Sequence, residues 1–394
     1  MKIAVINNLN SGSTGHLSIS LVRYLQSHGE DARFYYAYGK KNECGVRFSN
    51  KFFLKLNNLF SLCGFNRYAA IRTPTKKLIK YLKTFEPDIL NIQCLNIGSV
   101  NLKMLFAYAK KINIPVVITC HAFFYSTGNC GHPVNRCTKY MNSCHGCNHS
   151  FFATKSIFKR THKNFVQMKN WLSQCNIQFA CVSDYVTSMT KLSPITNLYK
   201  SRTIINGIET NVFKPISEIR ENKSNGKIRI LFTCSDTRGK LKGFPNFIAL
   251  LNRFRNNPDF EFVFVGKMHK RLESLNLINL GALHSKEEMA DAYRKADLTI
   301  MLSKDETFGM PIAESLCCGT PVAFFRCGGC EAITIKEYSG IFDYGDIDSL
   351  SDYLLEKKYL SLDRAEIAKI AKQKFDTNLV NEEYLKLIYE MVKK

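Results

Sequence analysis

Residues 298–314, LTIML-SKDETFGMPIAE, indicate the fold most clearly, because a short apolar run leads through a polar loop into a helix. Pro311 fits the first turn of that helix, where its missing N–H costs no hydrogen bond. The backbone N–H groups of Phe308, Gly309 and Met310 then lie at a helix N-terminus, which attracts anions. A strand, a loop and a helix in this order are the repeating unit of a helix-covered parallel sheet. The stretch therefore predicts an anion site at the carboxyl end of a buried strand.

The same alternation of apolar runs and amphipathic segments continues on both sides of this stretch. It predicts an α/β fold with two doubly wound sheets, in which ligands bind at the carboxyl ends of the strands. In the first half, a Gly/Ser/Thr turn at residues 11–15 precedes a helix that Gly29 ends. The expected strands are residues 2–7, 33–38, 88–93, 115–120, 177–182, 227–235, 260–266, 298–302 and 321–325.

A polar segment at residues 206–226 divides the chain, since it combines Gly-containing turns with a proline and several charges. We expect a first Rossmann-like domain at residues 1–205 and a second at 227–375. Residues 376–394 are expected to form a helix that packs back toward the first domain.

The positive charge is concentrated in the first half of the chain. Residues 1–205 hold 27 Lys and Arg against 6 Asp and Glu, whereas residues 206–394 hold 28 against 27. The net charges are therefore +21 and +1. A partner with many negative charges is implied, and nucleic acid and an anionic membrane surface are the two main alternatives.

No apolar stretch approaches the ~18 residues that a membrane-spanning helix needs. The N-terminal apolar run of five residues is too short for a secretory signal, which predicts a cytosolic protein. The 15 cysteines are then expected to be reduced or to bind metal, because disulfides are rare in that compartment.

Four cysteines lie in a segment rich in Gly, Asn and Ser at about residues 129–149: Cys130, Cys137, Cys144 and Cys147. Four thiols that end in a C-x-x-C pair suit a structural zinc ion, although the first two spacings are longer than usual. Free structural thiols are the alternative.

Several motifs in chain order resemble family 4 of the retaining glycosyltransferases, including bacterial enzymes of exopolysaccharide, O-antigen and colanic-acid type. The family has the GT-B fold, so the resemblance implies two Rossmann-like domains that face each other across a cleft. The matching motifs are the Gly12–Gly15 loop, His121 at a strand end, the Asn206-Gly207 junction, Lys242-Gly243, the pair Glu306 and Glu314, Gly319-Thr320-Pro321 and Gly328-Gly329-Cys330-Glu331.

The resemblance also implies roles for individual residues. Glu306 would hold the donor sugar near the reacting carbon, and Glu314 would bind the ribose hydroxyls. Lys242 would neutralise the diphosphate, with Arg238 beside it, or Lys240 in its place since the spacing of Arg238 is imperfect. The remaining implied contacts are His121 with the donor sugar, the amides of Phe308, Gly309 and Met310 with the diphosphate, and Gly15 with the donor.

The resemblance therefore implies a glycosyltransferase of class EC 2.4 that takes sugar from a UDP- or GDP-sugar. No metal is expected for catalysis, because two cations and a helix N-terminus can stabilise the leaving diphosphate. The first domain would bind the acceptor. Apolar residues such as Phe52 and Phe60 alternate with basic ones there, which predicts peripheral binding to the anionic inner face of the cell membrane and a lipid-linked saccharide acceptor. The alternatives are another GT-B enzyme, such as a nucleotide-sugar epimerase, and a basic nucleic-acid-binding protein.

Overall fold

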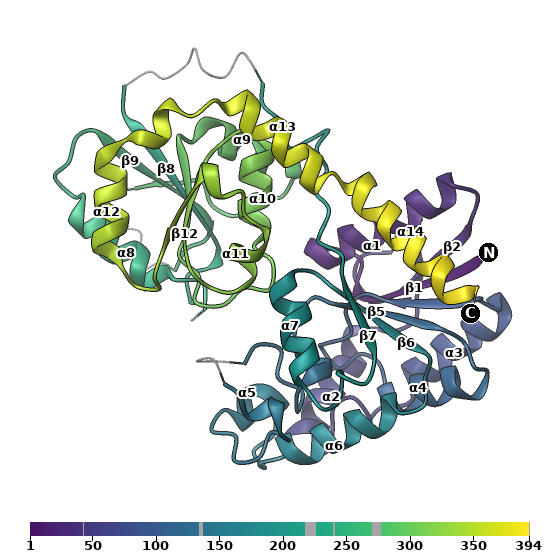
Figure 1. Cartoon of the computed structure of the whole chain (residues 1–394). Helices are drawn as coiled ribbons and strands as arrows, with labels where there is room; N and C mark the ends of the chain where they lie inside the picture. The colour runs from purple at the N-terminus through teal and green to yellow at the C-terminus, as the bar shows by residue number, and fades with distance from the viewer. Residues whose placement is uncertain (42, 134–136, 217–225, 239–240, 270–276, 394) are drawn as a thin grey trace. The chain divides into compact units, whose positions relative to one another are not determined.

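The computed structural model describes residues 1–41, 43–133, 137–216, 226–238, 241–269 and 277–393. It divides into two compact units (Figure 1). Unit 1 consists of Met1–Ile205 and Val380–Lys394, and unit 2 consists of Asn206–Leu379. Within the described residues each unit has one parallel sheet, of seven strands in unit 1 and six in unit 2.

The sheet of unit 1 has the order β3-β2-β1-β4-β5-β6-β7. Its central strands β1, β4, β5 and β6 are almost entirely buried, as expected for parallel strands with helices on both faces. The strands are β1 (Lys2–Leu9), β2 (Asp31–Tyr38), β3 (Val46–Arg47), β4 (Ile89–Ile92), β5 (Val116–Cys120), β6 (Ile177–Cys181) and β7 (Lys200–Thr203).

Eight helices of the described part of the chain belong wholly or mainly to unit 1. The last of them closes its core: Tyr384, Leu387 and Ile388 pack with Ile3, Leu21 and other residues of the sheet and α1. Figure 1 shows this C-terminal helix beside β1. The helices are α1 (Gly12–Ser27), α2 (Lys51–Leu62), α3 (Thr73–Phe85), α4 (Leu102–Lys111), α5 (Ser150–Thr154), α6 (Thr161–Leu172), α7 (Asp184–Leu192) and α14 (Thr377–Val392).

The sheet of unit 2 has the order β10-β9-β8-β11-β12-β13, so the chain starts in the middle, builds outward to one edge and then returns to build the other. Its core is rich in phenylalanine, and Phe232 and Phe247 stack at 4.3 Å between ring centroids. The strands are β8 (Ile228–Asp236), β9 (Phe260–Lys267), β10 (Ile278–Asn279), β11 (Leu298–Met301), β12 (Val322–Phe325) and β13 (Ser339–Phe342).

Several helices of unit 2 begin after a residue whose side chain accepts a hydrogen bond from their first N–H groups. In α9 the Ser285 side chain accepts from the Glu288 amide, and the Glu288 carboxylate accepts from the Ser285 amide, which is a capping box. The helices are α8 (Phe244–Arg253), α9 (Lys286–Lys295), α10 (Met310–Cys317), α11 (Gly329–Ile333), α12 (Ile347–Glu356) and α13 (Arg364–Phe375).

The predicted α/β fold with two doubly wound sheets is confirmed, and each of the nine expected strands has a counterpart. The sequence did not predict β3, β7, β10 or β13, which lie at or next to the sheet edges, where few residues are buried and the apolar pattern is weak. The expected turn at residues 11–15 was wrong in its extent, because α1 already begins at Gly12. Of the predicted linker, residues 217–225 lie outside the described part, while Ile208 and Phe213 are buried in unit 2.

Candidate functional site

The candidate site of unit 2 lies at the carboxyl ends of β8 and β11, the two neighbouring strands from which the sheet grows in opposite directions. Loops at such a switch point diverge, and ligands of doubly wound sheets bind there. The loop after β8 carries Lys242, and the loop after β11 carries Glu306. The sheet order therefore brings together two residues that are 64 positions apart.

Gly243 allows the two loops to approach each other. It has a φ of +72°, and a Cβ at this position would lie 1.8 Å from the carbonyl oxygen of Leu302 at the end of β11. The Lys304 amide donates to the Leu241 carbonyl at 2.8 Å and joins the same two loops. Only glycine fits at this position, which explains the Lys-Gly pair in the sequence.

Lys242 and Glu306 form the central ion pair of the site, with 2.7 Å between Nζ and Oε1. Burial disfavours the charged form of Lys242, but the charge and the hydrogen bond of Glu306 outweigh it and raise the pKa of the lysine. Lys242 is therefore a cation throughout the physiological pH range. The Glu306 side chain is mostly buried, whereas that of Lys242 is 41% exposed, so the lysine remains partly open to solvent.

The segment from Cys327 to Gly329 holds the backbone of Glu306. The Glu306 amide donates to the Cys327 carbonyl at 3.0 Å, and the Gly329 amide donates to the Glu306 carbonyl at 2.8 Å. A Cβ on Gly329 would lie 2.2 Å from the carbonyl of Thr307. The Glu331 carboxylate in turn accepts from the amides of Cys327 and Gly328. The Gly-Gly-Cys-Glu motif thus positions the loop that carries Glu306.

Gly309 is the N-cap of α10, with a φ of +92°, and Pro311 occupies the first turn as predicted. The first N–H groups of a helix have no acceptor within the helix and carry its positive dipole end. Phe308, just before this N-terminus, is buried. Since α10 begins at Met310, Glu314 lies early in its second turn, somewhat nearer the N-terminus than the sequence suggested.

Glu314 accepts a hydrogen bond from the Tyr293 hydroxyl at 2.9 Å. Burial raises the pKa of Glu314, while this hydrogen bond and the charge of Lys286 act in the opposite direction. Lys286 also pairs with Glu209 at 2.5 Å. Sequence reasoning missed Tyr293 and Lys286, and only the helical spacing of Tyr293 in α9 marked it as a residue that faces inward.

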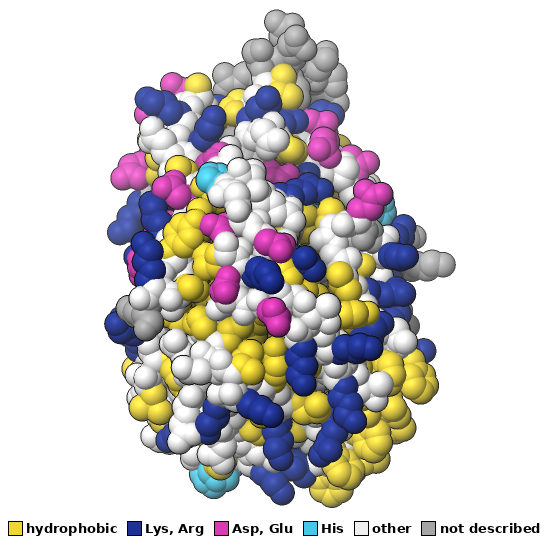
Figure 2. All heavy atoms as spheres, turned by 90° about the vertical axis from the view of Figure 1, so that its right-hand side faces the viewer, with side chains coloured by type: hydrophobic (Ala, Val, Ile, Leu, Met, Phe, Trp, Pro, Cys, Tyr) yellow, Lys and Arg dark blue, Asp and Glu magenta, His cyan; other side chains and the backbone are white. Residues whose placement is uncertain are grey.

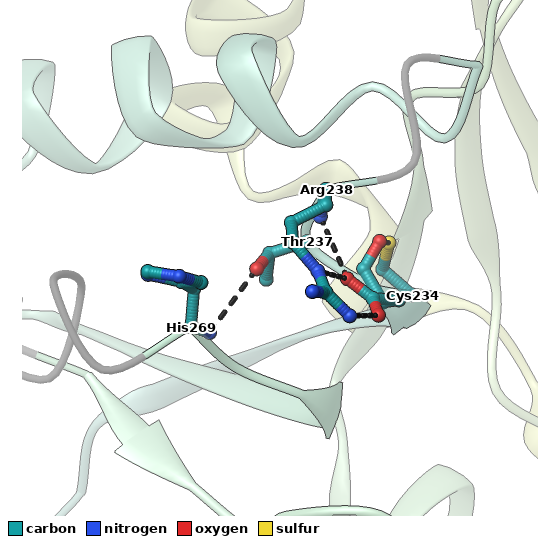
Figure 3. Close-up of polar contacts among 5 residues, drawn as sticks. Cys234, Thr237, Arg238 and His269 are labelled. Atoms are coloured by element: carbon teal, nitrogen blue, oxygen red, sulfur yellow. Dashed lines mark hydrogen bonds and ion pairs between the residues drawn. The ribbon is translucent and has the colours of Figure 1, made fainter.

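Arg238 forms an ion pair with Asp236, at the end of β8. Its guanidinium binds Asp236, with Nε 3.0 Å from Oδ1 and Nη2 2.6 Å from Oδ2. Figure 3 shows this contact, together with the His269 amide that donates to Thr237. The Arg238 hydrogen bonds hold the pKa of the Asp236 carboxyl well below its usual range. Lys240, the alternative to Arg238, lies outside the described residues.

In unit 1, His121 follows β5, and its Nε2 lies 3.2 Å from the Gln93 Oε1. Burial of the ring lowers the pKa of His121 to about 4, so the imidazole is neutral at pH 7. Gly15 lies in the first turn of α1, where a Cβ would be 2.6 Å from the carbonyl carbon of Asn10. Both residues lie at the carboxyl edge of the unit 1 sheet, as predicted from the ends of their strands.

The four cysteines of the predicted zinc site lie near one another. Burial raises the pKa of Cys130 to about 12, and the nearby thiols of Cys147, Cys144 and Cys137 raise it further. The Gly128 amide donates to Cys144 Sγ at 3.3 Å. However, no group of three or more His, Cys, Asp or Glu side chains among the described residues is arranged to hold a metal ion. The structure therefore gives the zinc prediction no support.

A search of the described helices finds none that combines the length and the apolar character needed to cross a membrane.

Two parallel Rossmann-like sheets define the GT-B class of fold, and in this chain a cation–carboxylate pair lies at the switch point of the second sheet. Solved structures agree over nearly the whole chain. Sucrose-phosphate synthase from Thermosynechococcus elongatus has a TM-score of 0.72 at 13% identity, and the alignment covers 99% of both chains. The Anabaena protein HepE in complex with UDP-glucose has a TM-score of 0.69 at 15% identity, over 99% of this chain and all of the other.

Residues 216–374, less than half of the chain, match the family described as glycosyl transferases group 1. A curated relative from Campylobacter jejuni, the N,N'-diacetylbacillosaminyl-diphospho-undecaprenol alpha-1,3-N-acetylgalactosaminyltransferase, is 24% identical over 159 residues. That alignment covers 39% of this chain and 42% of the relative, so this chain matches less than half of the length of the relative. The family resemblance and the GT-B fold predicted from the sequence are confirmed.

Proposed function

We propose that this chain is a retaining glycosyltransferase that moves a sugar from a nucleoside diphosphate donor to a saccharide acceptor. The observation that carries the proposal is the Lys242–Glu306 ion pair at the switch point, beside the N-terminus of α10. A lysine cation and a helix N-terminus together suit a diphosphate, the group that takes up negative charge as the sugar leaves.

Each residue of the unit 2 site has a role in this reaction. Lys242 neutralises the diphosphate, and the amides of Phe308, Gly309 and Met310 bind its oxygens. Glu306, held in place by Lys242 and by the backbone of Cys327, accepts hydrogen bonds from the donor sugar. Because these groups supply the positive charge, the reaction needs no bound metal ion.

Glu314 accepts hydrogen bonds from the ribose hydroxyls. The Glu314 side chain is half-buried, so a hydroxyl that it binds takes the place of the solvent that remains there. Tyr293 is a positioning residue here, since its hydroxyl occupies one carboxylate oxygen and fixes the direction of the other. The donor that we expect is a UDP- or GDP-sugar. A structural neighbour, HepE, is described as a complex with UDP-glucose.

The acceptor that we propose is a lipid-linked saccharide, bound by unit 1 at the inner face of the cell membrane and used for a surface polysaccharide. Two observations support it: the +21 net charge of residues 1–205, and the name of the Campylobacter jejuni relative, whose substrate is a diphospho-undecaprenol saccharide. His121 stays neutral and offers the donor sugar a hydrogen bond without adding a charge.

The test is calorimetric titration of the purified protein with UDP, GDP, ADP and CMP, followed by the sugar conjugates of whichever nucleotide binds. We expect one nucleoside diphosphate to bind to the wild type and to bind at least about 10-fold more weakly to Glu314→Ala. Lys242→Ala is also expected to bind the nucleotide more weakly than the wild type. Its matched control is Lys227→Ala, because Lys227 lies just before β8, at the amino end of the strand and away from the site. Binding of none of the four nucleotides would overturn the proposal. Interconversion of a free nucleotide sugar without acceptor would indicate an epimerase instead.

A further inference from the structure

Helix α2 buries polar side chains and exposes apolar ones. Asn57 and Ser61 are buried, and both are hydrogen-bonded: the Ile71 amide donates to Asn57, and Ser61 donates to the Thr154 carbonyl at 2.5 Å. On the outer side, Phe52 is 64% exposed and Leu59 56% exposed. A helix on the surface of a water-soluble protein normally has the opposite arrangement. Its outer face is therefore suited to an apolar neighbour.

A second segment, residues 151–158, extends this exposed apolar face. Ile157 is 72% exposed, and Phe151 and Phe158 are also exposed. The Phe158 ring packs against Gly64, where an added Cβ would lie 2.8 Å from the ring. The contact between Ser61 and Thr154 joins α2 to the same segment. We call the combined surface the apolar face; it consists of Phe52, Leu59, Phe60, Leu62, Phe65, Phe151, Ile157 and Phe158.

The surroundings of the apolar face are basic. From residue 47 to residue 183 the chain has 19 Lys and Arg but only 2 acidic residues, Glu86 and Asp88. Lys51 and Lys55 are exposed on α2, and Lys159 is exposed directly after Phe158. Figure 2 shows hydrophobic side chains gathered at the lower right edge of one face of the molecule, close to several Lys and Arg side chains. A surface that is apolar at its centre and cationic around it matches the boundary between lipid headgroups and acyl chains.

We propose that the apolar face is the surface by which unit 1 inserts into an anionic lipid bilayer, with Phe52, Leu59 and Ile157 among the acyl chains. Lys51, Lys55 and Lys159 then lie at the level of the headgroup phosphates. This proposal deepens the proposed function, since a lipid-linked acceptor lies at the same bilayer surface, but its test does not depend on catalysis. Leu59, Leu62 and Ile157 offer a nucleic acid neither a stacking surface nor a hydrogen bond, so a membrane fits this surface better.

The experiment is flotation of the full chain with vesicles of about 30% phosphatidylglycerol and about 70% phosphatidylcholine in about 0.1 M NaCl. The wild type is expected to float with these vesicles and to dissociate as salt is raised. Leu59→Ser combined with Ile157→Ser is expected to weaken binding by at least about 10-fold, because both side chains leave the acyl region. Leu198→Ser is the matched control. Leu198 is 69% exposed in unit 1, but it is not part of the apolar face and lies beside Lys200 and Met391.

The charge is tested separately with Lys55→Glu combined with Lys159→Glu, for which a loss of roughly 10-fold or more is expected. Lys103→Glu on α4 is its control. The proposal is overturned if the wild type does not float, or if both double variants float like the wild type. Size-exclusion dimers that the Leu59/Ile157 variant abolishes would assign the face to a second copy of the chain instead. RNA that binds to the wild type but not to this variant would assign it to nucleic acid.

Calorimetry of the same preparations separates this proposal from the proposed function. Nucleotide binding without flotation would overturn only the membrane surface. Flotation without nucleotide binding would overturn only the glycosyltransferase proposal. The Leu59/Ile157 variant is expected to bind nucleotide like the wild type, which also shows that it is folded.

Discussion

The two units share a strand order but differ in how charge is distributed between their surfaces and their sites. Residues 1–205 carry a net charge of +21, yet the site residues at the carboxyl edge of the unit 1 sheet form a neutral chain: Asn91 accepts from Gln93, and Gln93 lies next to His121. Residues 206–394 are close to neutral, yet their site contains Lys242, Glu306 and Glu314. Net charge therefore describes the surface of a unit, whereas the chemistry of its site follows from which side chains pair at the ends of the strands.

The largest expected effect is at the charged site. Lys242→Ala should lower kcat about 10²- to 10³-fold, because the lysine charge that neutralises the leaving diphosphate is lost. Steady-state rates with a saturating nucleotide sugar measure it. Lys227→Ala should keep the wild-type rate. A similar loss of kcat in both variants would contradict a specific role for the lysine at the carboxyl end of β8.

The neutral site of unit 1 is tested by the pH dependence of protein stability. The pKa of His121 is about 4 in the folded protein and ~6.5 in an unfolded chain, so between these values the unfolded state binds the additional proton. Stability is therefore lost as pH falls from about 6.5 to 4, by about 3 kcal/mol in total for this group. Urea unfolding at a series of pH values should show this loss in the wild type. In His121→Gln this part of the pH dependence should be missing, and an unchanged slope would mean that the pKa of His121 is the same in the folded and the unfolded protein.

Replacement of Glu314 is expected to weaken donor binding but to stabilise the folded protein. Glu314→Gln should weaken donor binding about 10- to 100-fold, since hydrogen bonds to charged groups contribute about 1.5–3 kcal/mol. Burial raises the pKa of Glu314 in the folded protein. At a pH above that raised pKa, the ionised carboxylate therefore lowers the free energy of unfolding. Below the pKa of an unfolded glutamate the group is protonated in both states, and this destabilisation is absent. The Gln variant should therefore melt at a higher temperature than the wild type at pH 8, with the difference disappearing in acid. Equal melting temperatures at pH 8 would contradict this account.

The smallest expected effect is at Tyr293, which contacts the donor only through Glu314. Tyr293→Phe removes one hydrogen bond of about 1 kcal/mol and should weaken nucleotide binding roughly 5-fold, with little change in kcat. A loss of kcat without a change in affinity would mean that Tyr293 acts on the reacting groups directly. Isothermal titration and steady-state kinetics on the same preparation distinguish the two.

Much of the fold could be predicted because its signals are local. Apolar runs marked all nine expected strands, and Pro311 and Gly309 marked the start of α10. The site residues Lys242, Glu306 and Glu314 were named from their motifs. The pairing of Arg238 with Asp236, two positions away, was not predicted, since Arg238 is exposed and no pattern fixes which partner a surface arginine takes.

The sequence alone determined the alternation of strands and helices, the position of the site loops and the uneven charge, because each depends on residues that are neighbours in the chain. The tertiary structure decided which distant residues meet: Lys242 with Glu306, Glu314 with Tyr293, and α2 with the segment around Thr154. It also decided that α2 buries Asn57 and Ser61 and leaves Phe52 exposed. Helical periodicity gives the spacing of apolar side chains, but only packing determines whether the apolar or the polar face is buried.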